Sequence, residues 1–223
     1  MPPGVVSLPV AADDRELKYV VPRATVPVVA ALLAGLCVPE QPHHRSIVDT
    51  VYLDTPDLRS LEEKLSSDFQ KTKVRLRWYD GAGSVFAEVK RRRGARRAKQ
   101  RIELPVDATR VARDARGMPR FDGLPALLAS RGVALPAILR PVVQLRYRRT
   151  RWVERTTGVR IALDTEIAAV AIAAPFAIAT GQPLPFAVLE LKGAAAGMPG
   201  ALAALPRMGC RRAAVSKLSL IHI

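Results

Sequence analysis

The sequence predicts an α+β fold in which a closed antiparallel β-barrel has a few short helices packed on its outside. Segments that alternate apolar and polar residues are short and follow one another at hairpin spacing, as in Thr72–Tyr79 and Val85–Lys90 on either side of a glycine turn at residues 81–83. No regular alternation of strand and helix indicates parallel βαβ units. A chain of 223 residues that is 49% hydrophobic is long enough for one domain with a real core.

Strands are expected where β-branched or aromatic residues occur in runs or alternate with charged ones. Ser46–Leu53 is rich in β-branched residues, and in Thr72–Tyr79 valine and leucine alternate with lysine and arginine. The other expected strands are Arg15–Val21, Lys99–Val106, Pro141–Val153, Val159–Thr165, Ile167–Ile172, Pro185–Leu191 and Ala213–Leu218.

Short helices are expected between these strands. Thr25 is a suitable N-cap, Pro27 fits the first turn, and Leu32, Leu33 and Leu36 continue an apolar stripe. The other expected helices follow Asp54-Thr55-Pro56, lie within an insert at Asp107–Gly132, and cover Pro199–Leu205.

Residues 14–218 are expected to form a single domain, because no linker of changed composition divides them. Residues 1–13 are expected to be a loose N-terminal segment. The ending at residues 219–223 does not look like the end of a finished domain, and it is interpreted as a tail that reflects either a truncation or non-native residues.

The charge balance points to a polyanionic ligand. The chain carries 35 Lys and Arg residues against 20 Asp and Glu residues, a net charge of +15. Such a chain attracts nucleic acid, anionic membranes or phosphorylated small molecules. Part of the excess can also reflect an arginine-rich and alanine-rich composition without any function. The uneven distribution of the basic residues favours a binding surface.

The protein is expected to be cytoplasmic. Cys37 and Cys210 cannot form a disulfide framework, and no CxxC spacing suggests a zinc site. Met1–Ala12 lacks the basic start and the apolar length of a signal peptide. The longest apolar run, Ile167–Ala179, contains Pro175 and is shorter than the roughly 18 residues that a membrane span needs.

Charged side chains share one face of several expected strands. Because side chains alternate across a strand, residues two apart lie on the same face. These sets are Asp14, Glu16 and Lys18; Arg75 and Arg77; Glu88 and Lys90; Lys99, Arg101 and Glu103; Arg160 and Asp164; and Glu190 and Lys192. The opposite faces of the same strands are apolar.

Two arrangements fit this pattern. In an ordinary sandwich the apolar faces form the core and the charges lie in water. In the alternative, the charges point into the lumen of the barrel and helices cover its apolar outside. Burying so many like charges costs too much free energy without a compensating ligand. Phosphate groups with a divalent cation would compensate, because Arg and Lys bind phosphate and carboxylates bind Mg²⁺ or Mn²⁺.

The densest basic patch is Lys90–Arg101, in which eight of twelve residues are basic and none is acidic. Its middle, Arg91–Arg97, is interpreted as an exposed loop between two strands at the mouth of the barrel. Such a loop can gather anions, or it can simply be solvated.

A series of motifs resembles the VTC domain, the polyphosphate polymerase domain of the vacuolar transporter chaperone family. In order, the motifs are Glu16-Leu-Lys18-Tyr19, VYLDTPDL at Val51–Leu58, KVRLRWY at Lys73–Tyr79, FAEVK at Phe86–Lys90, Lys99 with Arg101, RIALDTE at Arg160–Glu166, LELK at Leu189–Lys192, and Ser216-Lys217. The resemblance covers residues 14 to 218. That family is similar to the CYTH triphosphatases and adenylate cyclases, with which it forms the triphosphate tunnel metalloenzymes.

The resemblance implies a role for each matching position. The residues implied to grip phosphates and serve catalysis are Lys18, Arg75, Arg77, Lys90, Lys99, Arg149, Arg160 and Lys217. The positions implied to bind substrate are Arg101, Tyr147, Lys192 and Ser216. The implied ligands of Mn²⁺ or Mg²⁺ are Glu190, with Glu88 and Glu16 as helpers.

The resemblance also implies a reaction, the transfer of the γ-phosphoryl group of ATP to a growing polyphosphate chain. Phosphoryl transfer needs mainly positioning and neutralisation of charge, so a ring of cations and a metal can perform it without a Ser or His nucleophile. ATP and polyphosphate are the expected partners. Any coupling to a membrane would need a separate membrane partner, and the oligomeric state is left open.

Two alternative functions remain open on the sequence. One is a tunnel triphosphatase, which would hydrolyse triphosphate or a nucleoside triphosphate with the same cations. The other is a non-catalytic module that binds polyanions. A specific nucleic-acid partner is disfavoured, because only 5% of the residues are aromatic and no nucleic-acid-binding motif is present.

Overall fold

The computed structural model describes residues 6–8, 16–66, 69–80, 82–94, 96–108, 111–115, 117–133, 135, 138–173, 181–193 and 197–213. Its strands are β1 Val6–Leu8, β2 Glu16–Pro22, β3 Cys37–Pro39, β4 Arg45–Asp54, β5 Gln70–Tyr79, β6 Ala82–Arg93, β7 Arg96–Asp107, β8 Arg140–Glu154, β9 Arg160–Ile172, β10 Phe186–Lys192 and β11 Arg211–Arg212. Its α-helices are α1 Val26–Leu36, α2 Arg59–Leu65 and α3 Leu124–Ser130, and its short 3₁₀ turns are η1 Arg23–Thr25, η3 Gly200–Leu202 and η4 Leu205–Met208.

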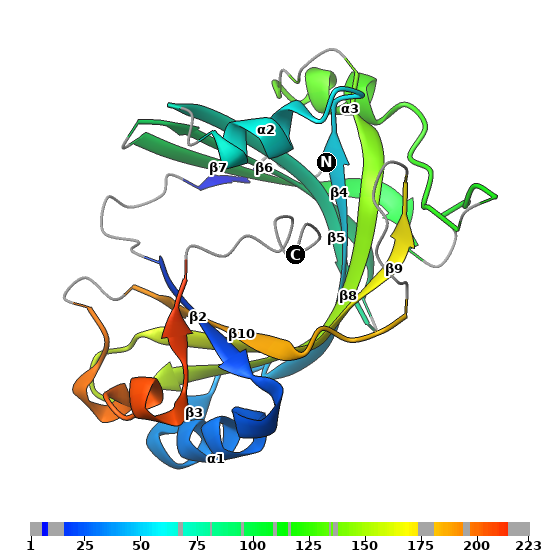
Figure 1. Ribbon diagram of the computed structural model, residues 1–223. Helices are drawn as coiled ribbons and strands as arrows, with labels where there is room; N and C mark the ends of the chain where they lie inside the picture. The colour runs from blue at the N-terminus through cyan, green and yellow to red at the C-terminus, as the bar shows by residue number, and fades with distance from the viewer. Residues whose placement is uncertain are drawn as a thin grey trace.

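The strands form one antiparallel sheet that curls around a central space (Figure 1). The order across the sheet is β1-β7-β6-β5-β4-β8-β9-β10-β2-β11, and β3 adds a short pairing to β8. The expected antiparallel sheet with few helices is therefore confirmed. The expected closed barrel is wrong for the described residues, because no hydrogen-bonded ladder joins the two ends of the order, β1 and β11. Closure depends on strand tilt and stagger, which an alternating sequence pattern does not specify.

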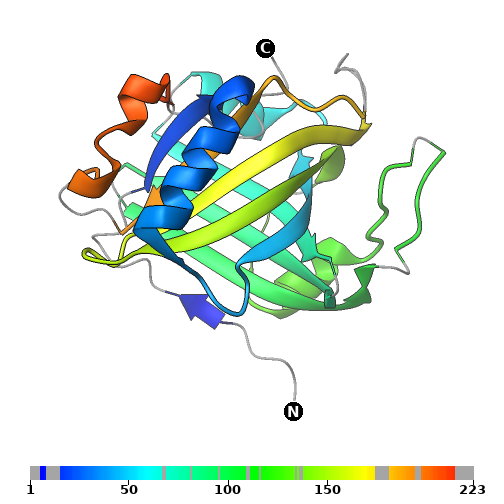
Figure 2. The ribbon, with the colours of Figure 1, turned by 90° about the horizontal axis from the view of Figure 1, so that it is seen from below.

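Helix α1 covers the convex face of β8, β9 and β10 (Figure 2). Its Val29 and Leu33 are fully buried against residues that include Trp152, Ile161 and Leu189. These sheet residues belong to the apolar faces of their strands. The apolar outside of the sheet is therefore a core between sheet and helix, which stabilises the fold by removing apolar surface from water.

Helix α3 covers the other half of the convex face. Leu124 and Leu128 pack into a cluster with apolar residues of β4, β5, β6 and β7, among them Leu76, Val89 and Ile102. The sheet is thus covered on its convex side in two places by apolar clusters. The charged faces of the same strands are left for the concave side.

The VYLDTPDL motif has a structural explanation in the buried carboxylate of Asp54, at the end of β4. Asp54 accepts hydrogen bonds from the backbone N–H groups of Thr55 and Ser60, both at 2.8 Å, and of Leu61 at 3.1 Å. Free N–H groups at a helix start need such an acceptor, and a negative charge is favourable there. Asp54 therefore ties the start of α2 to the sheet.

The segment expected to be a loop at Arg91–Arg97 is instead a continuation of two strands. β6 and β7 pair as far as Arg93 and Arg96, and the chain reverses at Gly94, which has a positive φ of 59°. The expectation of a loop was wrong because exposed arginine side chains do not prevent their backbone from pairing. The backbone of this segment continues the hydrogen-bonded ladder between β6 and β7. Figure 1 shows this hairpin reaching out beside α2.

Two other expectations need correction. Among the described residues of the insert at Asp107–Gly132, the α-helix is α3, and a short bridge joins Arg113 and Pro119. The two strands expected at residues 159–172 are one strand, β9, in which Glu166 has a positive φ of 51° and the register against β8 shifts. Such a bulge changes the face on which following side chains lie, which resembles a strand end in the sequence.

The ends of the chain also differ from expectation. Val6–Leu8 pairs with β7 as β1, although residues 1–13 were expected to be loose. The helix expected at Pro199–Leu205 consists of the 3₁₀ turns η3 and η4. Of the last strand expected at Ala213–Leu218, residues 214–218 lie outside the described part of the chain. Just before it, Arg211–Arg212 pair with β2 as strand β11.

The packing of α1 can be tested by shortening one buried side chain. Leu33→Ala is expected to lower the free energy of unfolding by about 2–5 kcal/mol, because Leu33 is 0% exposed and its truncation leaves a cavity. Val28→Ala on the same helix is the control, since Val28 is 56% exposed and its change should stay within about 0.5 kcal/mol. Urea denaturation measures both. Equal effects would contradict the assignment of the buried face.

Candidate functional site

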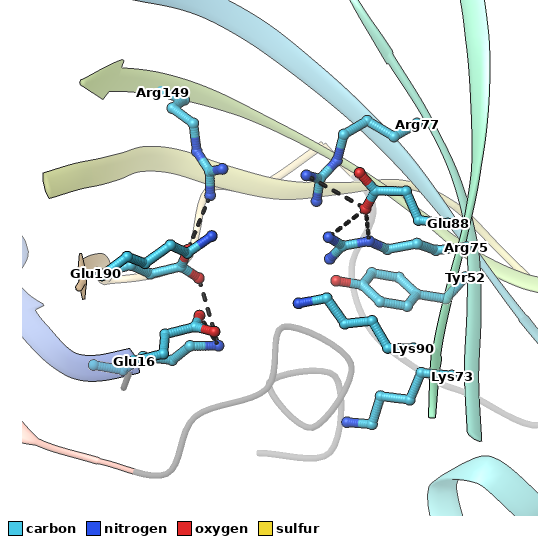
Figure 3. A pocket seen from close by; sticks show the side chains of 11 residues that line it. Glu16, Tyr52, Lys73, Arg75, Arg77, Glu88, Lys90, Arg149 and Glu190 are labelled. Atoms are coloured by element: carbon cyan, nitrogen blue, oxygen red, sulfur yellow. Dashed lines mark hydrogen bonds and ion pairs between the residues drawn. The ribbon is translucent and has the colours of Figure 1, made fainter. Parts of the chain in front are cut away.

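A basic cavity lies on the concave face of the sheet. It has a volume of about 170 Å³ and receives side chains from β2, β4, β5, β6, β8 and β10. The lining residues are Glu16, Lys18, Tyr52, Lys73, Arg75, Arg77, Glu88, Lys90, Arg149, Glu190 and Lys192. Seven basic side chains thus meet three acidic ones, and Figure 3 shows them converging from two opposing walls.

Strand alternation explains why these charges gather. On β5, Lys73, Arg75 and Arg77 line the cavity, while Val74 and Leu76 between them are buried in the apolar cluster under α3. The same rule orders the other strands. Of the two arrangements that the sequence allowed, the structure has the one in which charges face the interior and helices cover the apolar outside.

The β2–β10 wall, formed by Glu16, Lys18, Glu190 and Lys192, carries two carboxylates joined by one lysine. Lys18 Nζ lies 3.1 Å from Glu16 Oε1 and 3.5 Å from Glu190 Oε1. The register places Glu190 opposite Lys18, and Lys192 opposite Glu16. Burial acts to raise the pKa of Glu16, but the attraction of Lys18 and other lysines outweighs it and lowers the pKa.

Arg149 of β8 is fixed between the walls by a buried carboxylate. Its Nε and Nη2 donate to the two carboxylate oxygens of Asp164 at 2.6 and 2.7 Å, and Nη2 also lies 3.4 Å from Glu190 Oε2. Burial acts to lower the pKa of Arg149, but Asp164 raises it well above its usual value. A two-point pair of this kind sets the plane of the guanidinium as well as its charge.

The β5–β6 wall, formed by Lys73, Arg75, Arg77, Glu88 and Lys90, is organised by Glu88. Glu88 Oε2 lies 2.6 Å from Arg75 Nε, 2.5 Å from Arg75 Nη2 and 3.7 Å from Arg77 Nη1. Glu88 is 1% exposed. Burial raises its pKa, but the two arginines bring the pKa well below its usual range. Glu88 is therefore ionised and offsets part of the repulsion between Arg75 and Arg77.

Lys90 is a cation that the protein itself destabilises. Burial, followed by the repulsion of Arg75, lowers the pKa of Lys90 to about 7, and Glu16 opposes the shift only in part. Near pH 7 part of the Lys90 population is then neutral in the free protein. A bound polyanion would restore the charge, so the cavity is electrostatically suited to an anionic ligand.

Two predicted site residues lie on β7, beside the cavity lining. Lys99 is the cross-strand partner of Lys90, and burial lowers its pKa. The guanidinium of Arg101 stacks over the ring of Phe86 at 3.9 Å from the centroid. The Nε of Arg101 is buried without a hydrogen-bond partner in the described part of the chain.

The remaining predicted residues are placed differently. Arg160 is exposed at the start of β9, opposite Lys192. Tyr147 is buried, and its hydroxyl accepts a hydrogen bond from Arg77 Nη2 at 3.3 Å, so its contact with a substrate would run through that arginine. Ser216 and Lys217 lie outside the described residues.

Sequence reasoning missed two lining residues, Lys73 and Tyr52. Lys73 lies two positions before Arg75 in the KVRLRWY motif, so strict alternation could have identified it. Tyr52 is the cross-strand partner of Arg75. Tyr52 is itself uncharged, so a search for charged strand faces did not mark it.

The three predicted metal ligands fall on both walls. Glu16 and Glu190 share Lys18, whereas Glu88 is held by Arg75 on the opposite wall. In the described part of the chain, no group of three His, Cys, Asp or Glu side chains is arranged to hold a metal ion. Mg²⁺ and similar cations often bind one or two carboxylates together with substrate phosphates. Glu16 and Glu190 fit such a cation as a pair.

The model of the VTC domain family matches residues 13–219. The chain belongs to the VTC domain family. The resemblance seen in the sequence is thereby confirmed. No curated protein matches the chain.

Several solved structures are similar to this chain. A candidate adenylate cyclase from Bacillus halodurans has a TM-score of 0.53 and 13% identity, with 91% of this chain and 93% of that chain covered. A protein from Pyrococcus horikoshii OT3 has a TM-score of 0.49 and 15% identity, with 94% of this chain and 98% of that chain covered. A candidate adenylyl cyclase from Hippeastrum, with a dominant triphosphatase activity of its own, has a TM-score of 0.44 and 16% identity, with 94% of this chain and 95% of that chain covered. At 13% identity the Bacillus protein shows a shared fold alone.

Within the described ranges, no helix has the length and apolar character required to cross a membrane.

The depressed pKa of Lys90 predicts a pH dependence of anion binding. Binding favours protonated Lys90, so the affinity for inorganic tripolyphosphate should fall as pH rises above about 7, by up to about tenfold per pH unit. Calorimetry between pH 7.5 and 9, where the probe itself is ionised, measures this slope. Lys90→Arg keeps the charge and should flatten it. An unchanged slope in Lys90→Arg would contradict the role of this lysine.

Glu88 is expected to be essential for stability. Glu88→Gln leaves Arg75 and Arg77 without their buried carboxylate, and the free energy of unfolding should fall by about 3 kcal/mol at pH 7. Glu62→Gln on the exposed face of α2 is the control and should change it by less than about 0.5 kcal/mol. Added tripolyphosphate should recover more stability in Glu88→Gln than in the parent protein. A change as small as that of the control would show that Glu88 is not needed to offset the arginines.

Proposed function

We propose that the protein is a metal-dependent phosphotransferase that moves the γ-phosphoryl group of ATP onto a growing polyphosphate chain. Membership of the VTC domain family and the excess of seven basic over three acidic lining residues support the proposal. The observation that carries it is the convergence of these cations from two walls on one small cavity. A triphosphate is a ligand with enough negative charge to offset them.

Phosphoryl transfer suits such a cavity. The transferred group carries charge on its equatorial oxygens, and catalysis consists mostly of positioning and electrostatic stabilisation. Arg149 and Arg75 are held in fixed orientations by Asp164 and Glu88. Preorganised cations of this kind need little rearrangement as charge develops in the transition state.

The state of the carboxylates favours a phosphate acceptor over water. Glu88 is ion-paired with two arginines and Glu16 with Lys18, and both have lowered pKa values, which makes them weak general bases. Water must lose a proton as it attacks. The terminal oxygen of a polyphosphate chain is already ionised, so it can attack the γ-phosphorus directly. The bond between that phosphorus and the β–γ bridging oxygen then breaks, and ADP leaves.

A divalent cation fits the β2–β10 wall. Glu16 and Glu190 would hold Mn²⁺ or Mg²⁺ there, and the ion would neutralise charge on the phosphates that it contacts. Lys18 now lies between these two carboxylates. Its ammonium group would be released by the cation and could then contact a phosphate.

The test is to incubate the purified protein with ATP and Mn²⁺ or Mg²⁺ and to separate the products on a gel stained for polyphosphate. A ladder of chains with release of ADP is expected. Free phosphate without chains would move the assignment to a triphosphatase. Binding of ATP without either product would leave a polyanion-binding module.

The role of Glu190 is tested in the same assay. Glu190→Gln removes one carboxylate charge from the β2–β10 wall and should lower the rate of chain formation at least about 100-fold, because the metal loses a ligand. Glu62→Gln should keep the rate of the parent protein. Full activity of Glu190→Gln with an unchanged dependence on Mn²⁺ would contradict the metal role.

A further inference from the structure

The cations of the basic cavity continue beyond it along β5. Every second residue of this strand from 77 back to 71 is basic: Arg77, Arg75, Lys73 and Lys71. The first three line the cavity, and Lys71 lies one step further toward the turn of the β6–β7 hairpin. Because alternate side chains share a face, Lys71 belongs to the same concave side.

The register of β5, β6 and β7 arranges these cations in two rows. The inner row is Lys73, Lys90 and Lys99, and the outer row is Lys71, Arg92 and Arg97. Neighbours within a row are about 5 Å apart and the rows are about 7 Å apart along the strands. The two rows place six basic residues on one surface that starts in the cavity and ends at the hairpin turn.

The outer row is not neutralised within the described residues. None of the salt bridges there includes Lys71, Arg92 or Arg97, and both arginines are exposed. Arg92 Nε donates to the carbonyl oxygen of Gly94 at 2.8 Å, which holds its side chain beside the turn. Like charges directly opposite one another destabilise a sheet. A bound polyanion would offset this cost.

We infer that the two rows form a track for a linear polyphosphate chain that runs from the basic cavity to the β6–β7 turn. The inference rests on the proposed function and deepens it, because the track would guide the chain outside the reaction site. Two observations favour this occupant. The rows are continuous with the cavity, and the cavity of about 170 Å³ has room for only a few phosphate groups. A longer chain must therefore lie on the surface beyond it.

An oligonucleotide is the competing ligand. Phe69 is 67% exposed, and its carbonyl oxygen accepts a hydrogen bond from the N–H of Gly94, so a ring is available near the turn for stacking on a base. Neither row contains an aromatic residue. Closely spaced cations without aromatic residues suit a chain of phosphates better than a chain of bases.

The hairpin offers a matched pair of variants. Arg92 and Arg97 are cross-strand partners on the concave face, and the adjacent partners Arg93 and Arg96 lie on the opposite face. One double variant carries Arg92→Gln and Arg97→Gln, and the other carries Arg93→Gln and Arg96→Gln. Each therefore removes two positive charges from the end of the hairpin, the first from its concave face and the second from the opposite face. All four arginines are exposed, so both variants should fold.

The experiment measures the dissociation constants of inorganic tripolyphosphate and of a long-chain polyphosphate at two salt concentrations, without ATP or turnover. The concave pair should weaken long-chain binding by about tenfold and reduce its salt dependence, while the affinity for tripolyphosphate changes by less than about twofold. The convex pair should change both affinities by less than about twofold.

Three outcomes would overturn the track. Equal losses in the two variants would mean that net charge alone attracts the chain, and no loss in either would mean that the chain does not reach the hairpin. Tighter binding of a single-stranded oligonucleotide of equal charge, lost in the concave variant, would replace polyphosphate by nucleic acid. Because the measurement needs no catalysis, it decides the track even if the protein makes no polyphosphate.

Discussion

The concentration of like charge on the concave face of one curled sheet constrains the rest of the structure. Seven basic side chains that point into one cavity repel one another, and burial increases the repulsion because water no longer screens it. Three buried carboxylates offset part of this repulsion, and each forms an ion pair with an arginine. They are Glu88, Asp164 and Glu190. These pairs keep the arginines charged and oriented. The lysines of the cavity are therefore the cations whose charge a bound anion would neutralise most.

The two walls divide the work differently. The β5–β6 wall holds Arg75 and Arg77 around a single carboxylate, so its net charge is positive and its geometry is fixed. On the β2–β10 wall, Lys18 lies between Glu16 and Glu190, so charges of both signs are balanced and can exchange partners. A substrate bound between the walls would meet fixed cations on one side and exchangeable ones, with two carboxylates for a metal ion, on the other.

Several features could be predicted from the sequence because they depend on local patterns. The Arg75–Arg77 pair, like Glu190 with Lys192, was placed on one face by strand alternation alone, and both sets line the cavity. The sequence could not show which of these side chains lie close together in the folded protein. The family resemblance grouped Glu88 with Glu16 and Glu190 as metal ligands, and the fold places Glu88 beside Arg75 across one hairpin.

The sequence by itself determined the antiparallel strands, their charged and apolar faces, the family and most of the residues of the cavity. These follow from side-chain periodicity and short motifs, which each strand carries independently of its neighbours. Only the tertiary structure decided that the charged faces turn inward, that hydrogen bonds leave the described sheet open between β1 and β11, and that the arginines at 91–97 extend a hairpin. Those outcomes depend on register, strand stagger and the pairing of residues far apart in the chain, and no single segment of the sequence contains that information.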